Sequence, residues 1–166
     1  KVSSTEFGAN LGFFNGRIWL DASYFLTKTS DLITRTTPSF ASGSTVFLTN
    51  IGQTSGKGIE LTLGGTILQT TDLKWDMSLN YYSQETIIDE INDEQKEIAL
   101  ATTGQYGVYA VVGEAFPQIK ANVYARDPQG RIIVDGVSGH PKTKVGIYNL
   151  GKTTPDYILG WTTSVN

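Results

Sequence analysis

Apolar and polar residues alternate without interruption in Leu73-Lys74-Trp75-Asp76-Met77-Ser78-Leu79-Asn80-Tyr81. The pattern recurs in Gly58-Ile59-Glu60-Leu61-Thr62-Leu63-Gly64-Gly65-Thr66-Ile67. Successive side chains of a β-strand point to opposite faces of its sheet. Alternation over about ten residues therefore predicts strands with one apolar and one polar face.

Three further stretches alternate in the same way, so the sequence predicts five strands. We place them at residues 5–13, 17–27, 58–68, 73–83 and 157–166, each bound being approximate. The second strand is less regular, because Trp19 and Phe25 fall in its polar register. We keep this strand, and note that a β-bulge within it could shift its register.

Composition excludes several classes of protein. The chain has 166 residues and no Cys, which rules out a disulfide scaffold and thiolate chemistry. No run approaches the roughly 20 apolar residues of a membrane-spanning helix. A net charge of −3 without a basic stripe gives no support for nucleic-acid binding. The chain begins at Lys1 and ends within a predicted strand, so we expect it to be a piece of a longer protein.

The connections between the strands alternate between short and long. Asn15-Gly16 is a strong signal for a tight turn, and residues 69–72 form a second short turn. Residues 28–57 and 84–156 form two long loops. Outer-membrane barrels join short periplasmic turns and long extracellular loops in this order. We therefore predict an all-β fold, with antiparallel strands forming part of a transmembrane β-barrel with long extracellular loops.

Aromatic residues gather near both ends of the predicted strands, as expected for the interfacial girdles of a barrel. The periplasmic group is Phe13, Phe14, Trp19 and Trp75, and the outer group is Tyr24, Phe25, Tyr81, Tyr82 and Tyr157. The alternative is that these rings form the core of a secreted β-sandwich that binds glycans. Five strands are too few to close a barrel, so the remainder of the barrel must come from other parts of the protein.

Several segments resemble SusC/RagA-type TonB-dependent transporters. Asn50-Ile51-Gly52 followed by Lys57-Gly58-Ile59-Glu60-Leu61 is similar to the segment that leads from an extracellular loop into a barrel strand in that family. Further similar segments follow in the family's order: Gly12-Phe13-Phe14-Asn15-Gly16-Arg17-Ile18, Asp21-Ala22-Ser23-Tyr24-Phe25, Trp75-Asp76 with Asn80, Val112-Gly113-Glu114-Ala115-Phe116-Pro117-Gln118-Ile119, Tyr124-Ala125-Arg126-Asp127-Pro128-Gln129-Gly130-Arg131 and Leu150-Gly151-Lys152-Thr153-Thr154-Pro155-Asp156-Tyr157. Glu114-Ala115-Phe116 departs from the small or glycine-rich residues that the family more often has there.

The resemblance implies energised import across the outer membrane of a Bacteroidetes-type bacterium. The substrate would be a glycan or a peptide, held beneath a SusD-like surface lipoprotein that closes as a lid. TonB would act on a plug domain, and both the plug and the TonB-binding segment are absent from residues 1–166. These residues would supply barrel wall in contact with outer-membrane lipid, together with extracellular loops. A siderophore or cobalamin receptor without a lid is the alternative within the family.

The sequence offers no convincing catalytic, cofactor or metal site. Ser138, His140 and Asp135 could form a triad on paper, but no nucleophile elbow surrounds them. Asp127 begins a stretch that superficially resembles a calcium loop. Its fifth position is Arg131, however, and its twelfth is Ser138 where an EF-hand has Glu. Pro-Gln-Gly at 128–130 instead predicts a hairpin turn between residues 122–126 and 131–135.

One segment of the second long loop is acidic and has apolar residues at helical spacing rather than at every second position. Its carboxylates are Glu85, Asp89, Glu90, Asp93, Glu94 and Glu97. Ile87, Ile91 and Ile98 recur at helical spacing, so we expect a short amphipathic helix. Its acidic face would contact the lid lipoprotein, or hold divalent cations that bridge to lipopolysaccharide, or simply be solvated.

Aromatic rings of the loops are candidates for substrate contact, because flat rings can cover sugar faces or peptide side chains. They are Phe40, Phe47, Tyr106, Tyr109, Phe116, Tyr124 and Tyr148. The same rings would equally stabilise the loops by packing together, so the sequence assigns none of them to a substrate site.

Overall fold

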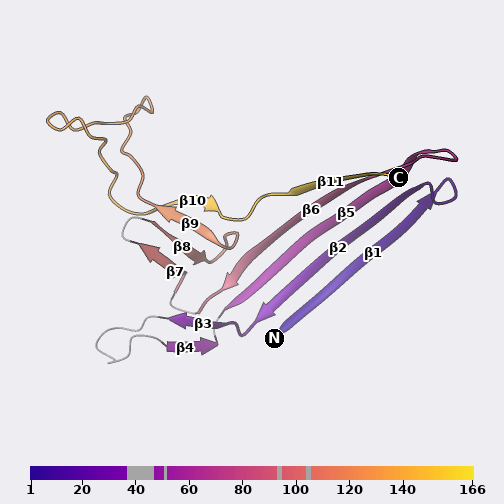
Figure 1. Ribbon diagram of the computed structural model, residues 1–166. Helices are drawn as coiled ribbons and strands as arrows, with labels where there is room; N and C mark the ends of the chain where they lie inside the picture. The colour runs from indigo at the N-terminus through magenta and orange to yellow at the C-terminus, as the bar shows by residue number, and fades with distance from the viewer. Residues whose placement is uncertain (37–46, 51, 93–94, 104–105) are drawn as a thin grey trace.

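Strands are the only regular elements in the described part of the chain. The computed structural model describes residues 1–36, 47–50, 52–92, 95–103 and 106–166, and the side chains of 33–50 lie outside the description. Five strands form one large sheet in the order β1-β2-β5-β6-β11, which we call the main sheet (Figure 1). Its members are β1 (Val2–Phe13), β2 (Ile18–Ser30), β5 (Gln53–Gln69), β6 (Lys74–Glu90) and β11 (Ile158–Val165).

All neighbours in the main sheet are antiparallel, and the connections are sorted by length. The short β1–β2 and β5–β6 turns lie at one end of the sheet, which we call the turn end (Figure 1). The two long excursions leave from the opposite end, which we call the loop end. The all-β antiparallel prediction is confirmed.

The strands run further toward the loop end than the alternation predicted. β2 continues to Ser30 rather than 27, β5 begins at Gln53 rather than 58, and β6 continues to Glu90 rather than 83. Backbone pairing continues there although the outward side chains have become polar, such as Lys57 and Glu85. At about 3.3 Å per residue, the 17 residues of β6 span roughly 56 Å.

β2 contains no bulge, so its register is not shifted. β2 pairs with both β1 and β5 in an unbroken register. The irregularity lies instead in β5, between Thr66 and Leu68. The Arg17 guanidinium donates to the carbonyl oxygens of Thr66 and Ile67 at 3.1 Å each, which satisfies acceptors that the bulge removes from the ladder.

Smaller sheets form at the loop end. β3 (Ile33–Thr36) and β4 (Phe47–Asn50) make a two-stranded ribbon within the first excursion. The second excursion contains a four-stranded sheet in the order β10-β9-β8-β7, which we call the loop sheet. Its strands are β7 (Glu97–Thr103), β8 (Tyr106–Val111), β9 (Gln118–Ala121) and β10 (Tyr148–Lys152).

The helix predicted within residues 85–97 does not exist. Residues 85–90 continue β6 and Glu97 begins β7. Ile88, Ile91 and Ala110 instead form a buried cluster, against which Ile98, Val112 and Phe116 pack. Of the isoleucines at helical spacing, Ile91 and Ile98 thus pack in this cluster and Ile87 lies in β6, so long-range packing overrides the helical spacing.

No helix among the described residues has the length and apolar character needed to span a membrane.

Candidate functional site

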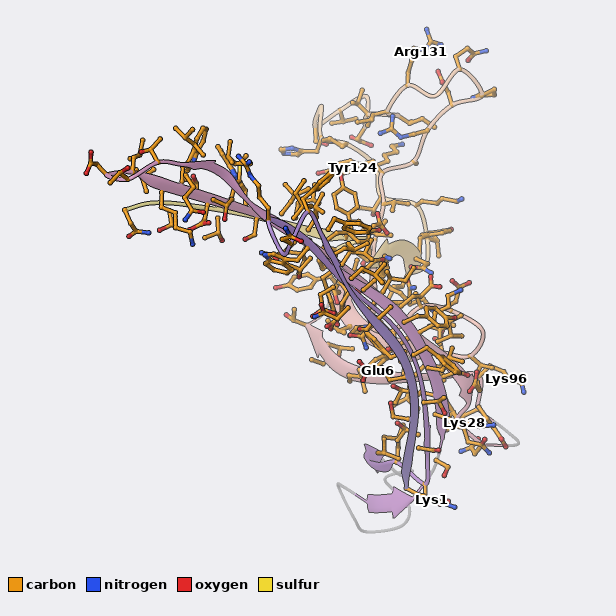
Figure 2. The ribbon with its side chains drawn as sticks, turned by 90° about the vertical axis from the view of Figure 1, so that its right-hand side faces the viewer. Lys1, Glu6, Lys28, Lys96, Tyr124 and Arg131 are labelled. Carbon is orange, nitrogen blue, oxygen red and sulfur yellow. The ribbon has the colours of Figure 1, made fainter. Side chains whose placement is uncertain are left out.

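The main sheet has one polar and one apolar face along its length, because directly opposed residues of antiparallel strands share a face. The polar face carries Ser4, Glu6 and Asn10 of β1, Asp21, Ser23 and Thr27 of β2, Glu60 and Thr62 of β5, Ser78, Asn80 and Gln84 of β6, and Thr162 and Ser164 of β11. The other face carries Phe7, Leu11, Phe13, Ile18, Leu20, Tyr24, Leu26, Ile59, Leu61, Leu63, Met77, Leu79, Tyr81, Leu159, Trp161 and Val165. Figure 2 shows the sheet close to edge-on, with side chains projecting from both faces.

Two aromatic rings on the polar face lie across glycines of the neighbouring strand. Phe25 is paired with Gly58, and a Cβ atom at Gly58 would lie 2.2 Å from the Phe25 Cζ atom. Trp19 is paired with Gly64, where a Cβ atom would lie 2.3 Å from Cζ2 of the indole. The missing side chains make room for the rings, so Trp19 and Phe25 occupy the polar face without any bulge.

Carboxylates dominate the charge of the polar face away from the sheet ends. Glu6, Asp21 and Glu60 lie there on three adjacent strands. No ion pair reaches them from the part of the chain that the structure describes. Together with the hydroxyl and amide groups of this face, they give a wall suited to water and polar solutes.

The apolar face ends abruptly toward the loop end. Tyr81 and Tyr157 stack there, with ring centroids 6.1 Å apart. The next outward positions on β5 and β6 are charged, and the Lys57 ammonium lies 3.4 Å from a Glu85 carboxylate oxygen. Toward the turn end, the Trp75 indole N–H donates to the Thr163 hydroxyl at 2.7 Å. The apolar face is therefore bounded at both ends by amphipathic aromatic residues.

The loop sheet is anchored to the polar-face side of the main sheet. Ile88 and Thr86 share the polar face of β6, and Ile88 packs into the buried cluster with Phe116 and Ala110. Residues 112–116 also pair with the part of β6 nearest the loop end, where the Phe116 N–H donates to the Thr86 carbonyl at 2.7 Å. An apolar cavity of about 220 Å³ lies at this junction. The loop sheet thus stands at the loop end, beside the polar wall.

Comparison with known proteins accounts for this arrangement. Residues 1–157 match the family model described as TonB dependent receptor-like, beta-barrel. The chain belongs to this TonB-dependent receptor family. The main sheet is accordingly a portion of an outer-membrane β-barrel, with the apolar face toward lipid and the polar face toward the lumen. This membership is incompatible with a secreted β-sandwich.

Two curated relatives come from Formosa agariphila. TonB-dependent receptor P26 is 25% identical over 182 residues, covering 96% of this chain and 18% of the relative. TonB-dependent receptor P3 is 23% identical over 181 residues, covering 94% of this chain and 18% of the relative. The chain thus spans less than a fifth of the length of these receptors.

Solved structures of RagAB show the same fold. The RagAB peptide transporter superposes with a TM-score of 0.77 at 20% identity, over 99% of this chain and 19% of that chain. The RagAB peptide importer in its "open-open" state gives a TM-score of 0.75 at 20% identity, with the same coverage. The fold therefore resembles one portion of the RagAB barrel.

Part of the expected aromatic girdle does not face lipid. Tyr24, Tyr81 and Tyr157 lie on the lipid side at the loop end, as predicted. Trp19, Phe25 and Tyr82 lie on the lumenal side, which for Trp19 and Phe25 is the polar register seen in the sequence. The position of a residue along its strand indicates whether it lies near a girdle. The two-residue period of the strand decides which face of the sheet its side chain occupies.

The acidic segment forms separate contacts rather than one acidic surface. Glu85 pairs with Lys57, Asp89 accepts a hydrogen bond from the Ser55 hydroxyl, and Glu97 pairs with Lys120. The remaining acidic positions that the sequence singled out include Asp93 and Glu94, which lie outside the described residues. With no helix, the predicted acidic helical face for a lid or for bridging cations does not form.

The Ser138, His140 and Asp135 constellation is a structural turn. Asp135 Oδ1 accepts hydrogen bonds from the backbone N–H of Ser138 at 2.9 Å and from its hydroxyl at 3.1 Å. His140 approaches Ser138 through its backbone N–H, at 3.4 Å from the hydroxyl oxygen. The backbone N–H groups of Ser138 and Val137 hold the pKa of Asp135 below its ordinary value. The Asp135 carboxylate is therefore an ionised hydrogen-bond acceptor that closes a turn, and Ser138 and His140 belong to that turn.

The Asp127 loop is likewise a turn and not a cation site. Asp127 Oδ1 accepts from the backbone N–H groups of Gln129 and Arg131 at 2.9 Å each, and Oδ2 accepts from the Arg131 guanidinium at 2.7 Å. These donors, led by the Arg131 N–H, lower the pKa of Asp127. The Arg126 and Ile132 bridge completes the turn that Pro-Gln-Gly predicted.

The candidate loop aromatics are not gathered at one site. Phe116 packs at the junction, Tyr109 is buried with the Lys120 ammonium 5.1 Å from its ring centroid, and the Tyr148 hydroxyl donates to the Val145 carbonyl. Tyr106 and Tyr124 are exposed. Phe40 and the side chain of Phe47 lie outside the described residues. Three of these rings therefore stabilise the loops.

Proposed function

We propose that this chain supplies wall and extracellular loops to a SusC/RagA-like importer of peptides or glycans. A SusD-like surface lipoprotein would close over the mouth as a lid, and TonB would energise the plug domain in other parts of the full-length receptor. The observation that carries the proposal is the combination of a two-faced barrel sheet with a folded loop sheet at its mouth. Likeness of the fold to the RagAB peptide transporter supports the same assignment.

The polar wall is suited to passage of an oligomeric polar nutrient. Hydroxyls and amides of the polar face can exchange hydrogen bonds with either peptide groups or sugar hydroxyls. The half-buried Tyr82 ring adds a flat apolar contact on the same face. Peptides and glycans both need polar groups together with a flat apolar contact, so we propose either class as the substrate.

Uptake by cells that carry the full-length receptor tests the proposal. We expect a receptor deletion to abolish uptake of labelled oligopeptides or oligosaccharides, and we expect loss of TonB or of the proton gradient to do the same. A matched strain with the receptor restored is the control. Uptake of an iron siderophore or cobalamin alone, unchanged by loss of the lipoprotein, would instead establish the lidless receptor and contradict the proposal.

A further inference from the structure

A second cavity, of about 300 Å³, opens on the lumenal side of β6 toward the loop end. Three parts of the chain wall it: β6, the 112–117 segment, and the segment that leads from β10 to the start of β11 (Figure 1). The walls include Tyr82, Gln84 and Thr86 of β6, together with Phe116, Pro117 and Pro155. We call this space the lumenal cavity.

Hydrogen bonds hold two of these walls against β6. The Phe116 N–H donates to the Thr86 carbonyl at 2.7 Å, which fixes the 112–117 segment beside the strand. The Ser83 hydroxyl donates to the Asp156 carbonyl at 2.8 Å, which fixes the segment between β10 and β11. The lumenal cavity is therefore preformed, and a ligand that enters it need not order the walls first.

Apolar residues of the lumenal cavity interrupt the polar register of the lumenal face. Ile158 is the cross-strand partner of Tyr82, whereas the next residues of β11 on this face are Gly160, Thr162 and Ser164. Ile158 is 53% exposed. None of the described residues that line the cavity is charged. A concave site with apolar walls and few polar groups is typical of a pocket for an uncharged ligand.

The lumenal cavity differs from the 220 Å³ cavity at the junction of the two sheets. The junction cavity is walled by the buried cluster, including Ile88, Ile91 and Ala110. Of the described lining residues, the two cavities share Thr86 and Phe116. The lumenal cavity is thus a feature of the lumenal surface, whereas the junction cavity belongs to the packing between the sheets.

Gln84 brings a hydrogen-bonding group to the lumenal cavity. Its side-chain oxygen accepts a hydrogen bond from the Tyr82 hydroxyl. The amide nitrogen is the other end of the same planar group, so its N–H donors are directed away from that hydroxyl. Gln84 is exposed, and these donors can therefore reach a carbonyl oxygen of a ligand.

The size and chemistry of the lumenal cavity favour an apolar side chain over a sugar ring. A cavity of about 150 Å³ with apolar walls holds a benzene molecule. The lumenal cavity is larger and has room for the whole side chain of phenylalanine or leucine. A sugar ring carries hydroxyl groups around its edge, and several would lie without a partner against Phe116, Pro117, Pro155 and Ile158. Burial of such unpaired groups is unfavourable.

We propose that the lumenal cavity is a subsite for one bulky apolar side chain of a peptide substrate, with Gln84 donating to a neighbouring backbone carbonyl of that peptide. This inference rests on the proposed function and deepens it, because it selects peptides rather than glycans. The cavity faces the lumen beside the loop sheet, so a substrate that enters the barrel passes it.

Peptide affinity of the full-length receptor, purified with any lipoprotein that accompanies it, tests the inference. The probes are uncharged pentapeptides of glycine and serine, blocked at both ends, with phenylalanine or alanine at the centre. We expect the phenylalanine peptide to bind at least about tenfold more tightly, because its ring leaves water on binding. Thr154→Trp places an indole in the cavity, since Thr154 lines it, and should reduce this ratio below about twofold.

Thr153→Trp is the matched control for this variant. Thr153 is the same residue type and equally exposed, but it is not among the described lining residues. We expect the control to keep the wild-type ratio. Heat-modifiable migration on gels checks that both variants have folded.

Photo-crosslinking to the wild-type receptor gives a readout that needs no variant. A pentapeptide with a photoreactive leucine at its centre should label residues within 82–86, 116–117 or 154–158, and labels confined to other regions would overturn the inference. Equal affinity of the two peptides for the wild type, or an unchanged ratio in folded Thr154→Trp, would also overturn it.

Failure of this inference is distinguishable from failure of the proposed function. A receptor that binds and imports neutral oligosaccharides but no peptide overturns the peptide subsite and leaves the importer standing. A receptor that imports neither class overturns the proposed function, and the subsite with it.

Discussion

Glycines and aromatic rings on neighbouring strands are complementary in shape at the residue scale. Gly58 and Gly64 would each weaken an isolated strand, because glycine loses more backbone entropy on folding and offers no side chain to pack. Phe25 and Trp19 cover these two positions and restore apolar contact on the lumenal face. The aromatic pair and the glycine pair are therefore parts of one packing arrangement.

Replacing Gly58 with Ala should destabilise the full-length receptor by about 1–3 kcal/mol, because the new methyl group overlaps the Phe25 ring. The unfolding midpoint in denaturant, measured in lipid vesicles, checks this. Gly12→Ala on the same face is the control, since nothing lies within 4 Å of its would-be Cβ. The Phe25→Ala/Gly58→Ala double variant should recover part of the loss, and equal stability of the two single glycine variants would contradict the packing argument.

Order in the turn that Asp127 closes should depend on pH. The pKa of Asp127 is lowered from 3.8, so its hydrogen bonds stabilise the turn fully above that value and the stabilisation is lost as pH falls through the lower pKa of the folded state. We expect hydrogen exchange at Gln129 and Arg131, corrected for intrinsic rates, to accelerate below pH 3.8. Asp127→Asn keeps one acceptor oxygen but does not titrate, so acceleration of the same size in this variant would argue against the carboxylate as the cause.

β6 belongs to two structures at the element scale. Its first part pairs with β11, and its later part pairs with residues 112–116 while its side chains enter the buried cluster. One continuous strand thus connects the barrel wall to the loop sheet without a flexible joint. Ile88 lies on the lumenal face of β6 and is 5% exposed, so it carries much of this connection.

Ile88→Ala should loosen the loop sheet while leaving the barrel intact. Truncating a buried isoleucine costs about 2–5 kcal/mol, and here the loss falls on the contact between two sheets. We expect faster proteolysis and hydrogen exchange in β7, β8 and β9, with unchanged protection in β1 and β2. Ile87→Ala alters the neighbouring residue on the opposite face and is the control. Loss of protection throughout the barrel would show that the two sheets do not unfold separately.

The described sheet has two unpaired edges at the scale of the whole molecule. β1 and β11 each lack a partner strand on one side within the described residues. In lipid each unsatisfied backbone group costs several kcal/mol, so an open sheet is unstable there. The solved RagAB chains and the curated receptors are about five times longer than this chain. Further strands of a full-length receptor would pair with the free edges of β1 and β11.

Residues 1–166 alone should therefore fail to fold into lipid vesicles. We expect them to show no heat-modifiable band on gels and no protease protection, whereas the full-length receptor shows both. The full-length protein refolded in the same vesicles is the control for the folding conditions. Cooperative unfolding of the isolated segment in lipid would contradict the requirement for the missing strands.

The sequence alone predicted the strands, their two faces and the ordering of short and long connections. These features are local, because a period of two residues assigns each side chain to a face and Asn15-Gly16 defines its own turn. Lipid and lumen impose opposite polarity on the two faces of the sheet. The alternation is therefore clear from the sequence of each strand alone, without knowledge of the strands beside it. The Asp127 hairpin is equally local and was also predicted.

Only the tertiary structure decided features that depend on distant residues. Trp19 and Phe25 required no bulge because Gly64 and Gly58, more than thirty residues away, provide the space for their rings. Ile91 and Ile98, two of the isoleucines at helical spacing, pack instead in a cluster with Ala110 and Phe116. Such contacts arise from folding of the whole chain, and no local period records them.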